Sequence, residues 1–223
     1  MIARMIEEDM LLPLNFENIP NYELVDNSFK NQAYDPNNEY SVPYTWGTVG
    51  VIYNTKYVDE ADIGGWDLLW NEKYADRIIM IDNSRDAFAI AEAMLGYSLN
   101  TEDPDELQAA AELLAEQTAV VQSYSMDDMY NVMENEEAWI APYYAGDAML
   151  MMDENPDLAF YLPEDQTFNV FIDAMCIPSC AEHKEEAELF INFLTSPEIS
   201  GGNMDYIGYG TPVSACLLYT SDA

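Results

Sequence analysis

The chain has 223 residues, of which 49% are hydrophobic, and its 42 acidic residues against seven Lys and Arg give a formal net charge of −35. This length and apolar content allow one large core or two modest ones, and they exclude a disordered acidic chain. The charge argues against a nucleic-acid partner and an anionic membrane surface, which both need basic groups, but it is compatible with a cationic ligand.

Short apolar runs alternate with helical patterns from residue 48 onward. The expected elements, in chain order, are strands at 48–54 and 77–81, helices over about 86–95 and 103–117, a strand at 119–124, a helix capped by Ser125, a strand at 138–144, a helix at 145–152, strands at 157–163 and 168–177, and a last helix with Ala187, Phe190, Ile191 and Leu194 on one face. The repeated strand-then-helix order predicts a mainly parallel, helix-flanked α/β sheet.

Two of the expected helices are marked by specific residues. Asp103 is placed as the N-cap of the helix over 103–117, with Pro104 at its first position, where a missing N–H does no harm. After Ser125, the residues Met126, Met129 and Met133 recur at helical spacing. That methionine stripe is typical of a core and not of a metal site.

The patterns that mark common enzyme and metal chemistry are weak. The sole histidine, His183, lies among charges at a helix start, so no nucleophilic triad can be assembled. Cys176, Cys180 and His183 have a spacing that suggests metal ligands, but Cys176 belongs to an apolar strand and no fourth ligand is near. DPNNEY (35–40) starts like a calcium loop but has Tyr40 where the turn needs glycine. We therefore expect no metal and no cofactor.

Carboxylates and aromatic residues lie instead at the predicted strand ends. These residues are Asp82, Asn83 and Asp86 after the strand 77–81, Tyr143 and Tyr144 at the end of 138–144, Phe171 and Asp173 on 168–177, and Tyr206 and Tyr209 beyond. Carboxylates neutralise an ammonium group, while aromatic rings hold the cation and its methylene chain. The alternative is that Asp82 and Asn83 only cap a helix and that the tyrosines fill the core.

Asp173 raises a question of its own, because it interrupts the apolar run NVFIDAMCIP (169–178). That run predicts a buried strand, in which an unpaired carboxylate costs several kcal/mol. We therefore expect Asp173 to face a ligand site.

Four stretches, two in the first half of the chain and two in the second, carry a family resemblance. YSVPYTWGTVGVIYNTKYV (40–58) with GGWDLLWNEKYADRI (64–78), and FIDAMCIPSCAEHKEEAELFINFLTSPEIS (171–200) with IGYGTPV (207–213), resemble extracytoplasmic solute-binding proteins. Within that family they are most similar to the spermidine/putrescine-binding branch of bacterial polyamine ABC importers. The resemblance covers nearly the whole chain to about Val213.

The resemblance implies a two-lobed, type II periplasmic-binding-protein fold of the α/β class. Residues 1–46 and 173–213 would belong to one incomplete lobe and residues 47–172 to the other. The family's opening segment has no counterpart before Met1, so we expect a fragment truncated at both ends, with apolar surface of the first lobe uncovered. The tail 214–223, which ends in ACLLYTSDA, is expected not to be native sequence.

The family's ligand positions carry over residue by residue. An acidic residue at a helix start falls on Asp86, and a neighbouring aspartate falls on Asn83, so one charge is missing unless Asp82 substitutes. Two tryptophan positions of the family fall on Tyr144 and Phe171. The family's hinge aspartate falls on Asp173, and one of its tyrosines falls on Tyr209. One carboxylate fewer would favour a shorter or less charged amine.

The function that the resemblance implies is a non-enzymatic receptor. It would bind a polyamine between its lobes and dock on the membrane permease subunits of an ABC importer, as a monomer that is periplasmic or lipid-anchored. A solute-binding protein for another small ligand is an alternative, although an anion is disfavoured because only Arg85 accompanies the candidate site. A carboxylate-based glycosidase and a module that binds no small molecule are the alternatives from other classes.

Overall fold

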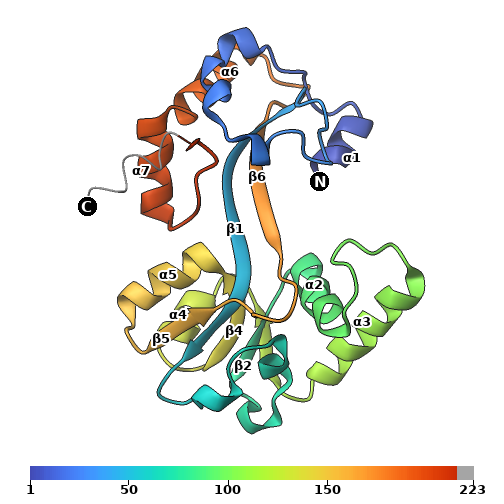
Figure 1. Ribbon diagram of the computed structural model, residues 1–223, viewed down its shortest axis with the longest axis vertical. Helices are drawn as coiled ribbons and strands as arrows, with labels where there is room; N and C mark the ends of the chain where they lie inside the picture. Colours follow the sequence, from blue (N-terminus) through green and yellow to red (C-terminus); the bar gives the residue numbers. More distant parts are fainter. Residues whose placement is uncertain (215–223) are drawn as a thin grey trace. The chain divides into compact units, whose positions relative to one another are not determined.

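The fold was obtained as a computed structural model, which describes residues 1–214 (Figure 1). The chain divides into two compact units: unit 1 consists of Met1–Gly47 and Phe171–Ala223, and unit 2 of Thr48–Val170. Of the tail 214–223, which is expected not to be native, residues 215–223 lie outside the described residues. Within residues 1–214, no helix is both long enough and apolar enough to cross a membrane.

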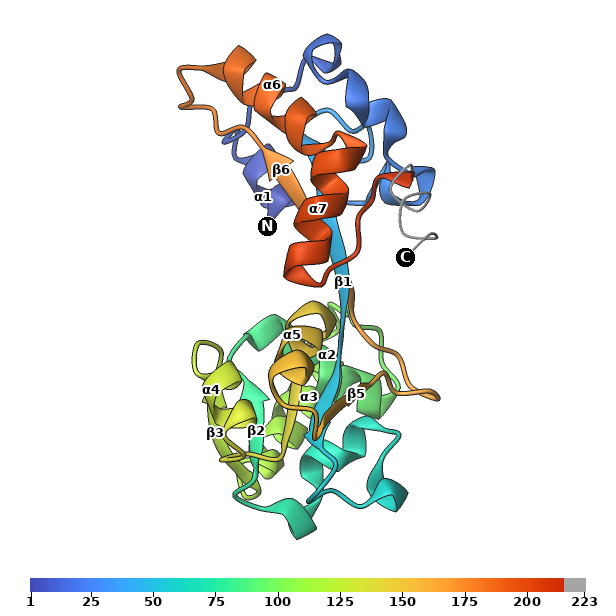
Figure 2. The same ribbon diagram turned by 90° about the vertical axis from the view of Figure 1, so that its left-hand side faces the viewer.

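Unit 2 is built around a mixed sheet. Its strands are the second half of β1 (Ser41–Asn54), β2 (Ile78–Ile81), β3 (Val121–Ser125), β4 (Ile140–Tyr144) and β5 (Leu158–Tyr161). Its α-helices are α2 (Ser84–Leu95), α3 (Pro104–Gln117), α4 (Met129–Glu134) and α5 (Ala145–Glu154), and three short 3-10 helices, labelled η, are η4 (Glu60–Asp62), η5 (Trp66–Trp70) and η6 (Glu72–Tyr74). The views in Figures 1 and 2 show α2 and α3 on one face of the sheet and α4 and α5 on the other. Both faces are thus covered, which explains why β2 is buried at all four of its positions.

The expectation of a mainly parallel sheet is wrong. The strand order is β3-β2-β4-β1-β5; β2 runs parallel to β3 and β4, but β1 runs antiparallel to both β4 and β5. In the β1–β4 ladder, Val49 lies opposite Tyr144 and Tyr53 lies opposite Ile140. The reason is that β1 enters the unit as one long strand and is not part of a strand–helix–strand repeat, which is the connection that makes neighbours parallel.

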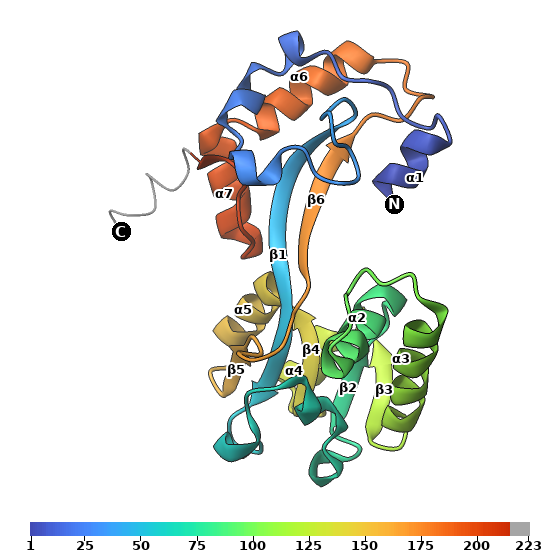
Figure 3. The ribbon, with the colours of Figure 1, turned by 45° about the vertical axis from the view of Figure 1, so that its right-hand side comes forward.

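Unit 1 contains the other half of β1 and most of β6, which pair in the same sheet (Figures 1 and 3). Its elements are α1 (Ile2–Glu7), η1 (Phe16–Asn18), η2 (Pro20–Leu24), η3 (Asn27–Phe29), β6 (Val170–Cys176), α6 (Lys184–Leu194) and α7 (Pro197–Ile207). A core of Ile19, Val42, Ile177 and Ile191 packs under α6. The glutamate Glu188 is buried beside it and accepts hydrogen bonds from Asn15 N (2.8 Å) and Asn18 Nδ2 (2.7 Å).

Several boundaries and faces differ from the sequence expectations. The first strand starts at Ser41 and runs through Gly47, because a glycine can remain in a strand where its neighbours pack closely. The fourth helix starts at Met129, since Ser125 ends β3 and uses its hydroxyl to accept from Asp128 N (3.3 Å). Phe190, expected on the buried face of the last helix, is 59% exposed, while the charged Glu188 occupies the inward position.

Candidate functional site

The polar residues of unit 2 meet because two parallel strands end side by side. β2 and β4 are neighbours, so their carboxyl ends lie at the same edge of the sheet. Asp82 and Asn83 follow the first of these strands, and Tyr144 ends the second. The helix α2 begins directly after Asn83 and brings Asp86 to the same edge.

Asp86 is the centre of this cluster. It is only 5% exposed, and its carboxylate accepts hydrogen bonds from Tyr144 Oη at 2.8 Å and from Asn169 Nδ2 at 2.8 Å. Burial, together with the charge of Asp86, raises the pKa of the Tyr144 phenol well above its usual value, so the hydroxyl stays a donor. A buried carboxylate with hydrogen bonds on both oxygens retains further acceptor sites, which suit an ammonium group.

Asn83 and Asp82 have different roles. The Asn83 side chain caps α2, since its Oδ1 accepts from Arg85 N at 3.1 Å and Asp86 N at 3.5 Å. Its Nδ2 also donates to Tyr144 Oη at 3.3 Å, so capping and membership of the cluster are combined in one side chain. Asp82 is exposed on the strand–helix link, where its backbone N–H bonds to Ser125 O (3.1 Å).

A smaller aromatic group lies in unit 1. The rings of Phe171 and Tyr209 meet edge to face, with centroids 6.0 Å apart at 63°. A side chain at Gly47 would put its Cβ 2.7 Å from Phe171 Cζ and 2.9 Å from Tyr209 Cδ1. Glycine at position 47 is therefore required for the two rings to lie against the strand β1.

The environment of Asp173 departs from the sequence expectation. The strand β6 is only partly buried, with Val170 54% exposed, and Asp173 itself is exposed. Partial burial nevertheless raises the pKa of the Asp173 carboxyl above its ordinary value. Asp173 follows Phe171 by two positions, so both side chains leave the same face of the strand. The prediction of NVFIDAMCIP as a buried strand is wrong: no residue of β6 is fully buried, and Val170 and Asp173, on opposite faces of the strand, are exposed.

Two further polar residues of unit 2, Asn169 in the Asp86 cluster and Asp147 beside Tyr130, were not selected from the sequence. Asn169 lies just before β6 and holds Asp86, although 83 positions separate them in the chain. Asp147, in the first turn of α5, accepts a 2.5 Å hydrogen bond from Tyr130 Oη and raises the pKa of the nearby Tyr143 phenol, a smaller effect than burial. The signal available for Asp147 was its place two residues into the helix that follows β4.

Tyr143, Tyr206 and the loop of Asp35, which the sequence also offered as candidates, lie outside the Asp86 cluster. Tyr143 is buried in the core and donates to Met126 O at 3.2 Å, whereas Tyr206 is 83% exposed on α7. The Asp35 carboxylate accepts from Glu39 N, Tyr40 N and Ser41 Oγ, and it therefore closes its own loop.

The spacing of Cys176, Cys180 and His183 suggested metal ligands in the sequence. Burial raises the pKa of the Cys176 thiol to about 11, which keeps it protonated at neutral pH. Within residues 1–214, no three His, Cys, Asp or Glu side chains come close enough to hold a metal ion.

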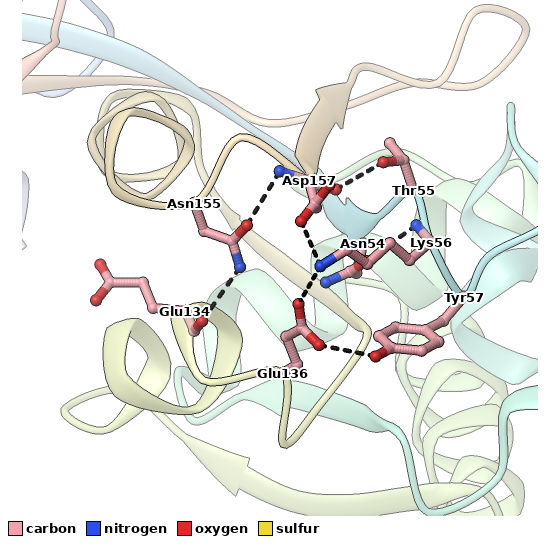
Figure 4. Close-up of polar contacts among 8 residues, drawn as sticks. All are labelled: Asn54, Thr55, Lys56, Tyr57, Glu134, Glu136, Asn155 and Asp157. Carbon is pink, nitrogen blue, oxygen red and sulfur yellow. Dashed lines mark hydrogen bonds and ion pairs between the residues drawn. The ribbon is translucent and has the colours of Figure 1, made fainter.

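Figure 4 shows a separate polar cluster, where β1 ends. Lys56 Nζ lies 2.8 Å from Glu136 Oε1 and 2.5 Å from Asp157 Oδ2, and Tyr57 Oη donates to Glu136 Oε2 at 2.7 Å. The Tyr57 ring stacks on Trp139 at 4.6 Å. The two carboxylates, Asp157 first, raise the pKa of the Lys56 ammonium. The cluster fixes the end of the strand, because Lys56 joins two carboxylates, and one ammonium against two acids leaves a net charge of −1.

Comparison with known proteins identifies the class of protein. The profile of the bacterial extracellular solute-binding protein family matches residues 1–216. The chain belongs to this family, which confirms the resemblance seen in its sequence. Family members are solute-binding proteins of transport systems.

Among the similar curated proteins are several named for polyamine binding. The chain is 31% identical over 211 residues to the spermidine/putrescine-binding periplasmic protein of Salmonella typhimurium, a match that covers 95% of this chain and 60% of the relative. It is 26% identical to a putrescine/agmatine-binding protein of Pseudomonas aeruginosa, covering 96% and 63%. The chain thus spans about three fifths of the length of these curated relatives.

Solved structures show the same fold. The substrate-binding protein PotD of a spermidine/putrescine ABC transporter from Streptococcus pneumoniae, in complex with calcium and HEPES, is 34% identical with a TM-score of 0.86, covering 100% of this chain and 68% of that one. The Tp0655 (TpPotD) lipoprotein of Treponema pallidum is 27% identical with a TM-score of 0.89, covering 96% and 69%. The expected α/β periplasmic-binding-protein fold class is confirmed.

Proposed function

We propose that this chain is part of the extracytoplasmic substrate-binding component of a bacterial ABC importer, and that its ligand is a polyamine such as putrescine or spermidine. The observation that carries the proposal is the buried Asp86 carboxylate, oriented by Tyr144 and Asn169. A carboxylate in this setting is a counter-charge for an ammonium group, and the aromatic ring beside it suits a methylene chain. The names of the relatives point to the same ligand class.

Unit 1 would contribute Asp173 with the Phe171–Tyr209 pair, which repeats the combination of one carboxylate and aromatic rings. In this proposal Asn83, Asp82 and Asp147 tune the local charge around Asp86. The role is binding without turnover, followed by delivery to permease subunits, by a monomer that is periplasmic or lipid-anchored. The crossings at Gly47–Thr48 and Val170–Phe171 would be the hinge positions.

The test is a calorimetric titration of the chain with putrescine and with spermidine, beside the variants Asp86→Asn and Asp173→Asn. Each variant keeps the shape of the side chain and removes one negative charge. A charge-assisted hydrogen bond contributes about 1.5–3 kcal/mol, so each variant should weaken binding roughly 10- to 100-fold.

Asp153→Asn is the matched control, because Asp153 is an exposed residue at the end of α5. It removes the same charge from unit 2 and should leave the affinity within about twofold. Equal affinities for Asp86→Asn, Asp173→Asn and the parent chain would refute the assignment of the site. If the chain shows a cooperative unfolding transition, and is therefore folded, but binds neither amine, the proposal of a polyamine ligand is refuted.

A further inference from the structure

The segment that follows α7 is fastened to β1 at one short stretch of unit 1, where it passes beside the strand in Figures 1 and 2. The backbones of Trp46 and Gly210 exchange two hydrogen bonds, one in each direction, and both measure 3.0 Å. Thr45 Oγ1 donates a third hydrogen bond to Gly210 O at 3.1 Å. These three bonds fix the backbone of Gly210, and Tyr209 is the residue directly before it.

The indole of Trp46 lies on the same glycine. A Cβ at Gly210 would collide with Trp46 Nε1 and Trp46 Cε2, so the indole occupies the space that a side chain would fill. The ring of Phe29 also lies near the indole, with centroids 5.8 Å apart. The absence of a side chain at position 210 is therefore what lets Trp46 cover this part of the segment.

The backbone of Tyr209 is fixed on its other side as well. Gly208 ends α7 in the left-handed region, with φ 72°, which glycine adopts without strain. Tyr209 N donates to Met204 O in the last turns of that helix, at 3.2 Å. Tyr209 thus lies between a helix end and the attachment of Gly210 to Trp46.

This double attachment sets the place of the Tyr209 ring, which lies against Gly47 and meets Phe171 edge to face. A ring attracts a cation only when the charge is over its face, within about 6 Å of its centre. A half-buried tyrosine on a connecting segment has freedom that binding would have to remove. Fastening the segment to Trp46 removes that freedom before a ligand arrives.

We propose that Trp46 is a positioning residue of the amine site: its indole covers Gly210, and through Gly210 it keeps the Tyr209 ring beside Phe171. The role in binding rests on the proposed function, which assigns Tyr209 to the amine. The positioning itself is a property of the chain without ligand, and it can be measured separately.

The first measurement is the nuclear Overhauser effect between the Phe171 and Tyr209 rings, by NMR of the full chain without ligand. Trp46→Ala removes the indole but keeps the backbone hydrogen bonds, and Gly210→Ala forces the indole away. Each variant should weaken the ring-to-ring signal by roughly half or more, whereas Trp46→Phe, which keeps an aromatic ring, should restore most of it. Tyr206→Ala is the matched control, because Tyr206 is 83% exposed on the same helix end.

The second measurement is a calorimetric titration of the same variants with putrescine. Trp46→Ala and Gly210→Ala should each lower the affinity about tenfold, as far as Tyr209→Ala does, because all three remove one cation–ring contact. Trp46→Ala combined with Tyr209→Ala should bind no more weakly than Tyr209→Ala alone, since Trp46 acts through that ring.

The outcomes separate the positioning from the ligand. A ring-to-ring signal that is unchanged in both Trp46→Ala and Gly210→Ala overturns the positioning. A weakened signal with unchanged affinity, or losses of affinity that add in the double variant, overturns the role of Trp46 in binding. If the parent chain binds no amine, the proposed function fails, while the ring-to-ring signal still decides whether Trp46 positions Tyr209.

Discussion

The carboxylate of Asp86 is held by hydrogen bonds on both oxygens, whereas Glu92, six residues further along α2, has none among the described residues. The two acids differ in their neighbours and not in their helix. Asn83 adds a third case: its amide caps the helix and touches Tyr144 in a position where the family resemblance places an aspartate. A single substitution can therefore change the charge of the candidate site without disturbing the cap.

At the residue scale we predict the effect of Asn83→Asp on ligand preference. Aspartate caps a helix about as well as asparagine, so stability should change by less than about 0.5 kcal/mol. A second carboxylate beside Asp86 should tighten spermidine binding several-fold more than putrescine binding, because spermidine carries one more positive charge. Calorimetric titrations of the variant with both amines measure this ratio. An unchanged ratio of affinities would show that Asn83 does not face the ligand.

At the scale of elements, α6 is attached to η1 by its one buried acid. Glu188 accepts from Asn15 N and Asn18 Nδ2, and Lys184 Nζ lies 3.1 Å from its carboxylate. Burial acts to raise the pKa of Glu188, but the three partners together outweigh it, and the pKa is lowered below its ordinary value of 4.5. The helix is thus held by a charged group at a position where an apolar residue would be expected.

We predict that Glu188→Gln lowers the free energy of unfolding at pH 7 by roughly 2 kcal/mol, because a neutral amide cannot accept from all three donors. A lowered folded-state pKa means that the contribution of Glu188 is present above pH 4.5 and is lost as the pH falls through the folded-state value. Urea unfolding at pH 7 and pH 3 should therefore show a difference between parent and variant that shrinks at pH 3. Glu185→Gln, on the exposed side of α6, is the control and should have little effect at either pH. An equal loss at both pH values would contradict the pKa argument.

At the scale of the whole molecule, the dominant property is the charge of −35. Seven basic residues cannot pair 42 acids, and Lys56 and Lys73 are each shared by two carboxylates. Most acidic groups therefore repel one another across the surface. This repulsion destabilises a compact chain and at the same time attracts cations.

Added salt should raise the thermal stability of the chain and lower its affinity for cations, because it screens both the repulsion and the attraction. Raising NaCl from 10 mM to 0.5 M shortens the screening length from about 30 Å to well under 10 Å, so the Tm should rise, by about 2–4 °C for each kcal/mol of repulsion removed. The affinity for any bound amine should fall over the same range. Thermal unfolding and titrations at both salt concentrations measure the two effects. Near pH 4.1, the isoelectric point, the rise in Tm should largely disappear; a Tm that falls with salt at pH 7 would refute the repulsion argument.

Local elements could be predicted from the sequence by itself. The Asp103–Pro104 start of α3, the buried strand after Arg77 and the short helix after Tyr144 all occur where the sequence indicates, because each depends on residues adjacent in the chain. The family was also recognisable from the stretches 40–58, 64–78, 171–200 and 207–213. Asn83, Asp86 and Tyr144 were selected as strand-end residues, and the structure brings them together.

Only the tertiary structure decided the direction of β1, the exposure of β6 and the partners of each buried acid. A side-chain pattern records which face of a strand is apolar, but not which strand lies beside it or in which direction that strand runs. Asn169 holds Asp86 across 83 positions, and Glu92 lacks such a donor. Hydrogen bonds and ion pairs are effective only over about 3–4 Å, so whether a carboxylate finds a hydrogen-bond donor depends on folded distances that sequence spacing does not contain.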